Sequence, residues 1–116
     1  MKTLQTTVLG TGNSVPFFLD LNANPFQVSI GCVVNTTGQA ATWNVQHCFD
    51  YATAYLPSWD GSTNVTWFNN SGIANATANI SGNYAFPVVA VRLNVPNSTA
   101  TTTVTMYLTQ ADTVPP

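Results

Sequence analysis

Apolar and polar residues alternate along most of this chain, and a period of two is the pattern of strands that bury one face. The run 26–34 shows it most clearly, because every second position is apolar: Phe26, Val28, Ile30, Cys32 and Val34. The run 42–50 repeats the pattern on a second segment, with one face made of Trp43, Val45, His47 and Phe49. Both runs predict half-buried strands.

The segment 35–38, Asn-Thr-Thr-Gly, has the composition of a tight turn. We therefore expect the runs 26–34 and 42–50 to pair as a hairpin. Alternation also predicts strands near 3–9, 15–21, 65–68, 88–95 and 101–110, whereas most of 51–81 predicts loops. About seven or eight short strands at this spacing are typical of an all-β fold. The expected fold is a single-domain antiparallel β-sandwich, jelly-roll-like.

The 116 residues suffice for one domain, 1–116, and are too few for two. Thr, Asn, Ser, Gly and Pro are abundant and Glu is absent, which favours strands and turns over helices. Both ends look weakly anchored, because 1–7 is polar apart from Leu4 and 112–116 closes on two prolines, which cannot donate to a sheet. We predict that the terminal segments 1–7 and 112–116 are mobile.

Charged residues are scarce: two are basic and four are acidic, together 5% of the chain, whereas a soluble domain averages about 25%. Because the chain has only two cationic side chains, it can neutralise few phosphates, and we expect no nucleic-acid partner. The apolar runs are shorter than the ~20 residues that span a bilayer, and the polar N-terminus lacks the apolar stretch of a signal peptide. We expect no membrane insertion. A nearly uncharged surface suits permanent burial against companions, since few charges have to be desolvated.

No residue pattern predicts catalysis, a cofactor or a metal ion, and we expect a protein that is not an enzyme. His47 and Asp50 could suggest acid–base chemistry, but residues three apart on a strand face opposite sides. Asp50, Asp60 and Asn64 lack the spacing of a calcium loop. The segment Gly10-Thr11-Gly12 lacks the lysine and the helix of a phosphate loop, so we interpret it as a turn.

The two cysteines, Cys32 and Cys48, raise the question of a disulfide. In the expected hairpin they stand about five positions apart and on opposite faces, which is beyond the reach of a bridge. We therefore expect two free thiols that fill apolar space, as free cysteine often does.

A set of aromatic residues between positions 51 and 86 leaves a second function class open. A carbohydrate-binding module would stack such rings on sugars and bind hydroxyls through nearby Asn or Asp side chains. The alternative is structural: Trp67 and Phe68 cap the core, and Trp59 fills a subunit contact, where aromatics are enriched. The residues concerned are Tyr51, Tyr55, Trp59, Trp67, Phe68, Tyr84 and Phe86.

The final strand, 101–110, carries no charge, although free β proteins protect their outer strands with charges or proline. Either the fold covers this strand or a partner pairs with it, and the second option suits an assembly component. As candidate partner contacts we take Leu4, Tyr55, Trp59 and Tyr107.

Several segments resemble small structural proteins of tailed bacteriophages that are found with the head genes. The resemblance covers about residues 25–111 and rests on the segments FQVSIGCVV (26–34), WNVQHCFD (43–50), TWFNN (66–70), GNYAFPVVAVRLNV (82–95) and 101–110. It implies that 87–95 is a core strand whose Arg92 faces outward. It transfers no functional residue, since these segments are strand and turn motifs.

The resemblance implies a virion protein, a cement or decoration subunit on the outer capsid surface, made in the host cytoplasm. Its partners would be the major capsid protein and further copies of itself in a homo-oligomer. The charge count agrees with an outer position, because a chain with two cations gains nothing beside packaged DNA. A phage tail or fibre component is the first alternative, and the carbohydrate-binding module is the alternative of another class.

Overall fold

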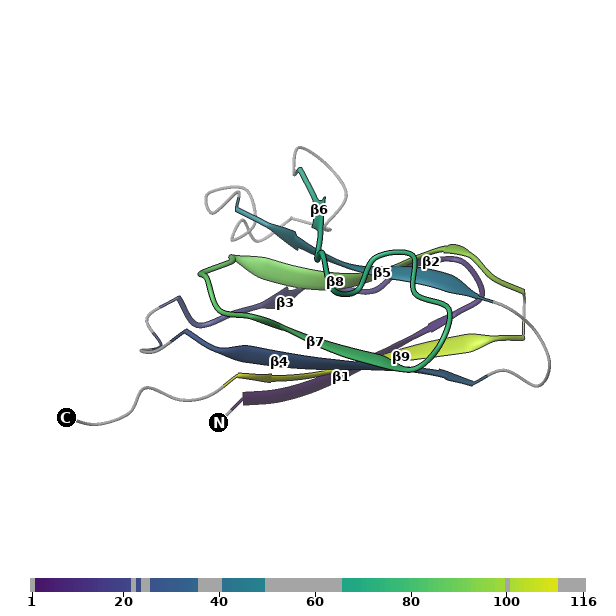
Figure 1. Ribbon diagram of the computed structural model, residues 1–116, viewed down its shortest axis with the longest axis horizontal. Helices are drawn as coiled ribbons and strands as arrows, with labels where there is room; N and C mark the ends of the chain where they lie inside the picture. Colours follow the sequence, from purple (N-terminus) through teal and green to yellow (C-terminus); the bar gives the residue numbers. More distant parts are fainter. Residues whose placement is uncertain are drawn as a thin grey trace.

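The computed structural model describes residues 2–21, 23, 26–35, 41–49, 66–99 and 101–110, and these contain strands and no helix. Two antiparallel sheets pack face to face as a sandwich (Figure 1). The strands are β1 (Lys2–Leu9), β2 (Gly12–Asn13), β3 (Phe17–Phe18), β4 (Val28–Asn35), β5 (Thr42–Cys48), β6 (Phe68–Asn69), β7 (Ile80–Tyr84), β8 (Ala90–Asn97) and β9 (Thr103–Gln110). Within the described residues no helix is long and apolar enough to cross a bilayer.

The strand order defines the architecture. The first sheet has the order β1-β9-β4-β7, and the second has the order β2-β8-β5-β6, with β3 also pairing with β8. The pairs are nested along the chain: β1 with β9, β2 and β3 with β8, β4 with β7, and β5 with β6. A long hairpin rolled up into two sheets gives this order, which is the jelly roll. The predicted all-β sandwich is confirmed.

One predicted strand pair is wrong. The strands β4 and β5 do not form a hairpin with each other, because β4 pairs with β7 and β9 in the first sheet and β5 pairs with β6 and β8 in the second. The chain between them passes from one layer to the other. Both cysteines are free and buried, as predicted, although the spacing argument assumed the wrong partner strands. Burial raises the pKa of the Cys32 thiol to about 11, so this thiol is protonated and unreactive at neutral pH.

The first and last strands pair with each other along their whole length, from Lys2 opposite Gln110 to Leu9 opposite Thr103. Of the two alternatives for 101–110, the structure shows that the fold covers this strand, because β9 lies between β1 and β4. Residues 2–7, which the sequence suggests are mobile, belong to this ladder. The other predicted mobile segment, 112–116, lies outside the described residues.

The predicted strand near 15–21 is reduced to β3, and β2 lies before the predicted range. Pro16 explains the gap between these two strands, because proline cannot donate to a ladder. Ser14 bridges the gap with two hydrogen bonds to Leu93. Its backbone N–H donates to the Leu93 carbonyl at 2.8 Å, and its hydroxyl accepts from the Leu93 N–H at 2.8 Å. The two short strands thus act as one interrupted strand against β8.

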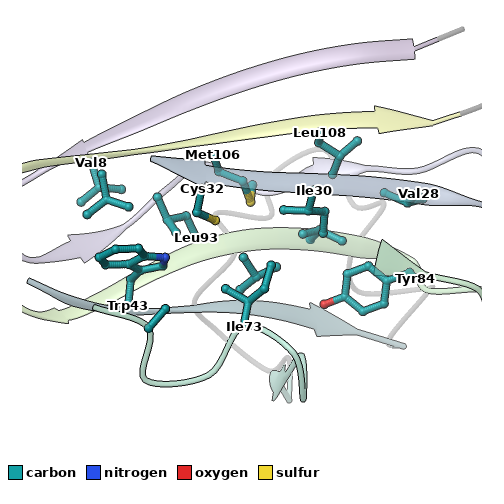
Figure 2. Close-up of a cluster of buried hydrophobic side chains, with 14 of the residues drawn as sticks. Val8, Val28, Ile30, Cys32, Trp43, Ile73, Tyr84, Leu93, Met106 and Leu108 are labelled. Atoms are coloured by element: carbon teal, nitrogen blue, oxygen red, sulfur yellow. The ribbon is translucent and has the colours of Figure 1, made fainter. Parts of the chain in front are cut away.

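The core fills the space between the sheets with side chains from the predicted apolar faces (Figure 2). Trp43 is fully buried, and its backbone pairs with Ala76 rather than with β8, because the β5–β8 register shifts between Thr42 and Asn44. The alternation of β4, β8 and β9 is confirmed, since their inward positions are all buried except Val34, which is half-buried: Val28, Ile30, Cys32, Val91, Leu93, Val95, Val104, Met106 and Leu108.

Gln110, at the end of β9, is almost completely buried although it is polar. Its side-chain amide makes two hydrogen bonds to the backbone of Asp20: Nε2 donates to the Asp20 carbonyl at 2.9 Å, and Oε1 accepts from the Asp20 N–H at 2.9 Å. Both polar ends of the amide are therefore satisfied, which removes most of the cost of burying it. The contact fastens the segment after β3 to the first sheet.

Candidate interaction surfaces

The outward surface of the first sheet is chemically uniform. Its residues carry no charge, and most are Thr, Ser or Asn; we call this surface the Thr-rich face. The ladder registers place on it Thr3, Gln5, Thr7, Leu9, Ser29, Gly31, Val33, Asn35, Ser81, Asn83, Thr103, Thr105, Tyr107 and Thr109. Cross-strand hydrogen bonding occurs within it, since the Thr7 and Thr105 hydroxyls lie 2.9 Å apart.

Two apolar side chains stand out from the middle of the Thr-rich face. Val33 is 42% exposed and Tyr107 is 45% exposed. Gly31 lies opposite Tyr107 in the register, and a Cβ added at Gly31 would meet nothing within 4 Å. The sheet surface beside the Tyr107 ring is therefore open, and a partner can approach the backbone closely there.

The four candidate partner contacts have different outcomes. Tyr107 lies on the Thr-rich face and is accessible. Leu4 belongs to the opposite side of β1, where it is partly buried and packs against the core. It supports the sandwich and is not a surface anchor. Tyr55 and Trp59 lie outside the described residues.

A pocket of about 370 Å³ opens beside the edge strands β6 and β7, and we call it the aromatic pocket. It is lined by His47, Asn69, Asn70, Ser71, Gly72, Gly82, Asn83, Tyr84, Ala85 and Phe86. None of these residues is charged. The volume is at the small end of the range of roughly 300–1,000 Å³ that small-molecule sites occupy.

His47 is the centre of an aromatic cluster at this pocket. Its ring stacks on Phe68 at 6.0 Å between centroids and meets Phe49, Tyr84 and Phe86 edge-on at 5.3, 4.9 and 5.8 Å. The three phenylalanines are each about half exposed, at 47–50%. Rings that are this exposed and this close form one apolar patch, which is uncommon on a free monomer.

The buried polar groups of the cluster satisfy one another. The His47 Nδ1 lies 2.8 Å from the Tyr84 hydroxyl, and this contact joins the second sheet to the first. Burial raises the pKa of the Tyr84 hydroxyl far above its usual range, and the Asn70 side chain, which hydrogen-bonds it, only partly opposes this. Burial also lowers the pKa of His47. Both side chains are therefore neutral near pH 7.

Acidification is expected to destabilise the fold through His47. Its pKa is lowered in the folded chain, whereas in the unfolded chain it keeps an ordinary value near 6.5. The unfolded state therefore binds the proton first, so the contribution to stability is complete above about pH 6.5 and is lost as the pH falls toward the folded pKa. Urea denaturation followed by circular dichroism at about pH 7.5 and about pH 5 measures this loss.

The variant His47→Gln is the control for this pH effect, because glutamine retains a polar group and does not titrate. Its stability is expected to change less between the two pH values than that of the wild-type chain. Equal pH dependence in both chains would show that another group is responsible.

Arg92 lies on the outward surface of the second sheet, as the resemblance implies for this core strand. Its Nε donates to the Gln46 Oε1 at 2.9 Å, and its guanidinium lies 4.3 Å from the centre of the Trp67 ring. Trp67 packs against the small cluster of Cys48, Val89 and Ala90 and so covers the outside of this sheet rather than the main core. The guanidinium charge is thus engaged within the molecule.

The structure brings together no metal-binding group of three or more His, Cys, Asp or Glu side chains among the residues it describes. Asp50, Asp60 and Asn64, which were considered for calcium, lie outside those residues; Asp50 is also the carboxylate considered with His47. Gly10 and Thr11 link β1 to β2, whose first residue is Gly12, and the two glycines have φ values of 70° and 143°. The expected change of direction is present at Gly10 and Thr11, whereas Gly12 already belongs to a strand.

Comparison with known proteins adds no relative: no family model, no curated protein and no solved structure matches the chain.

Sequence reasoning identified some of the aromatic pocket but missed the residues that organise it. Tyr84, Phe68 and Phe86 belonged to the proposed aromatic set, and His47 was expected to be structural. Asn70 was not expected to take part in the pocket, although it accepts from the Gly72 N–H at 2.8 Å and donates to the Asn83 carbonyl at 3.1 Å. The signal was present in the segment Asn70-Ser71-Gly72, because Asn side chains often bond the backbone two residues later in a turn.

Proposed function

We propose that this chain is a non-enzymatic virion structural protein, a decoration subunit that binds the outer surface of a capsid and stabilises its lattice. The observation that carries the proposal is the Thr-rich face, a four-stranded surface without a single charged side chain. Together with a chain that is only 5% charged, it supports attachment through contact area and hydrogen bonds.

The Thr-rich face suits a flat partner surface better than a small ligand. Its hydroxyl and amide groups can exchange water for polar groups of a partner, and its apolar members, Leu9, Val33 and Tyr107, supply the buried area that stabilises a complex. No ion pair has to be stripped of water when the face is covered. The same properties permit contacts between copies of this chain, so a homo-oligomer on the particle is part of the proposal.

Stabilisation would follow from mass action. A protein that binds the assembled lattice and not its free subunits stabilises the lattice by RT ln(1 + [L]/Kd) at each site. Many sites on one particle add these contributions against the pressure of packaged DNA. The protein needs no catalytic group for this role.

Deleting the gene from the phage that carries it tests the proposal. Particles without the protein are expected to rupture and release DNA at a lower temperature, and adding the purified chain is expected to restore the wild-type value. Dye accessibility of the DNA during heating gives the rupture temperature. Particles of unchanged heat stability would contradict the cementing role, and protein found only on tails in electron micrographs would favour the tail or fibre alternative.

Attachment to the particle is expected to depend little on salt. Exposed ion pairs are screened at high ionic strength, and this chain has too few charges to rely on them. Sedimentation of decorated particles in low salt and in about 1 M sodium chloride, followed by gel quantification, measures the bound fraction. Release of most of the protein in high salt would mean that charges on the partner carry the attachment.

A further inference from the structure

The aromatic pocket contains a hydrogen-bond chain whose direction can be followed from the backbone. The Asn70 Oδ1 accepts from the Gly72 N–H at 2.8 Å, so the orientation of the Asn70 amide is fixed. Its NH₂ group donates to the Asn83 carbonyl at 3.1 Å. The Asn70 side chain also opposes the rise in the pKa of the Tyr84 hydroxyl, which is the effect of a donor beside that oxygen and leaves the hydroxyl proton for another partner.

We assign the Tyr84 hydroxyl as the donor to His47, whose Nδ1 lies 2.8 Å away. A neutral imidazole with an accepting Nδ1 carries its proton on Nε2. The ring is neutral because burial lowers its pKa. His47 lines the pocket, and the hydrogen bonds recorded for the described residues leave its Nε2–H without an acceptor there. The chain therefore presents a donor of fixed orientation to a ligand.

The walls of the pocket determine which ligand chemistry fits beside this donor. Phe86 lines the pocket and is 49% exposed, so about half of its surface is open to a ligand. Amide and hydroxyl groups of the residues from Asn69 to Ser71 also line the pocket. An ionic ligand would lose its water without meeting a counter-charge, because no lining residue is charged. The pocket is thus suited to a neutral molecule that combines many hydroxyls with an apolar ring face.

We propose that the aromatic pocket binds a neutral pyranose sugar, which stacks on Phe86 and accepts a hydrogen bond from the His47 Nε2–H. The site is separate from the Thr-rich face, so this proposal does not depend on capsid attachment. A decorated particle would then display sugar-binding sites on its surface.

Glycan-array binding by the full chain at neutral pH tests the proposal. Neutral glycans are expected to bind, and Phe86→Ala is expected to weaken their binding at least tenfold. The matched control is Tyr107→Ala, which removes an equally exposed aromatic ring from the Thr-rich face and is expected to leave binding unchanged. No bound glycan, binding of acidic glycans alone, or binding that survives Phe86→Ala would overturn the proposal.

A second measurement uses the unmodified chain, in case a variant is poorly folded. Nitrogen-15 NMR of the imidazole is expected to show the Nε2–H tautomer of His47. Titration with the best glycan from the array is expected to shift the Nε2 signal. A resonance of the Nδ1–H tautomer, or an Nε2 signal that does not move on saturation, would rule out the assigned donor.

Discussion

Trp43→Ala is expected to lower the free energy of unfolding by about 3–5 kcal/mol, the usual cost of removing a buried large aromatic side chain. The indole has no exposed surface, and it fills the space between β5 and the first sheet (Figure 2). A loss of this size is a large share of the roughly 5–15 kcal/mol that stabilise an ordinary domain. Urea denaturation followed by far-ultraviolet circular dichroism measures the change.

The control for this substitution is Phe86→Ala, which also removes an aromatic ring but at a half-exposed position. We expect it to cost about 1 kcal/mol or less, as substitutions outside a core usually do. If both variants lost the same stability, the packing role assigned to Trp43 would be wrong.

Trp43→Phe separates packing from hydrogen bonding at the same position. Among the described residues the Trp43 Nε1 is the buried side-chain nitrogen or oxygen that has no good hydrogen-bond partner. The nearby Cys32 sulfur interacts with it only weakly, as sulfur is a poor acceptor. Phenylalanine removes this unsatisfied donor and retains most of the ring, so the loss of stability should be much smaller than for alanine.

The double substitution Val33→Asp with Tyr107→Asp is expected to abolish the proposed attachment to a capsid. Both side chains lie on the Thr-rich face, and covering that face would bury two carboxylates without partners. An unpaired buried charge costs about 3 kcal/mol or more, which is a hundredfold or more in Kd. Co-sedimentation of the purified variant with particles that lack the protein measures the binding.

A matched control for attachment is Thr77→Asp. It adds a carboxylate at an exposed position of the loop before β7, which is not one of the residues of the Thr-rich face. It is expected to bind like the wild-type chain. If the double variant also bound normally while remaining folded, another surface would have to make the contact.

The sequence predicted the faces of the strands better than their partners. Alternation in 26–34 and 101–110 identified the buried side of β4 and β9 correctly, because the side that faces the core is a local property of each strand. It could not identify neighbours, since the same alternation fits any register or sheet. The expected hairpin of β4 with β5 failed for this reason, as the chain crosses to the other layer between them.

The lack of charge in 101–110 left two explanations open, and the favoured one, pairing with a partner, is not the one that the structure shows. An uncharged strand is needed at an edge that binds a partner, and it is equally suitable for an interior strand with neighbours on both sides. The structure selects the second case, because β9 has β1 on one side and β4 on the other. β9 is an interior strand because it pairs with β1, the first strand of the chain, and no local sequence pattern reveals a pairing between such distant segments.

The sequence identified aromatic residues of the pocket but did not predict that they come together. Phe68 was expected to cap the core, but it is 47% exposed and stacks on His47 instead. The contact between His47 and Tyr84 joins residues from different sheets, and their separation of 37 positions gives no periodic signal. Asn70 acquires its role only when β6 and β7 come together around it.

The pairing of β1 with β9 also determines how the molecule would respond to tension. Lys2 pairs with Gln110 at one end of the β1–β9 strand pair, so a force that pulls these two residues apart acts first on the hydrogen bonds at that end. Hydrogen bonds that bear a force one after another, and not together, break at low force. If the proposed capsid subunit were tethered through these two residues, β1 and β9 would separate from this end at low force. Pressure distributed over the outward surface of the sheet would instead be shared by all hydrogen bonds of the pair.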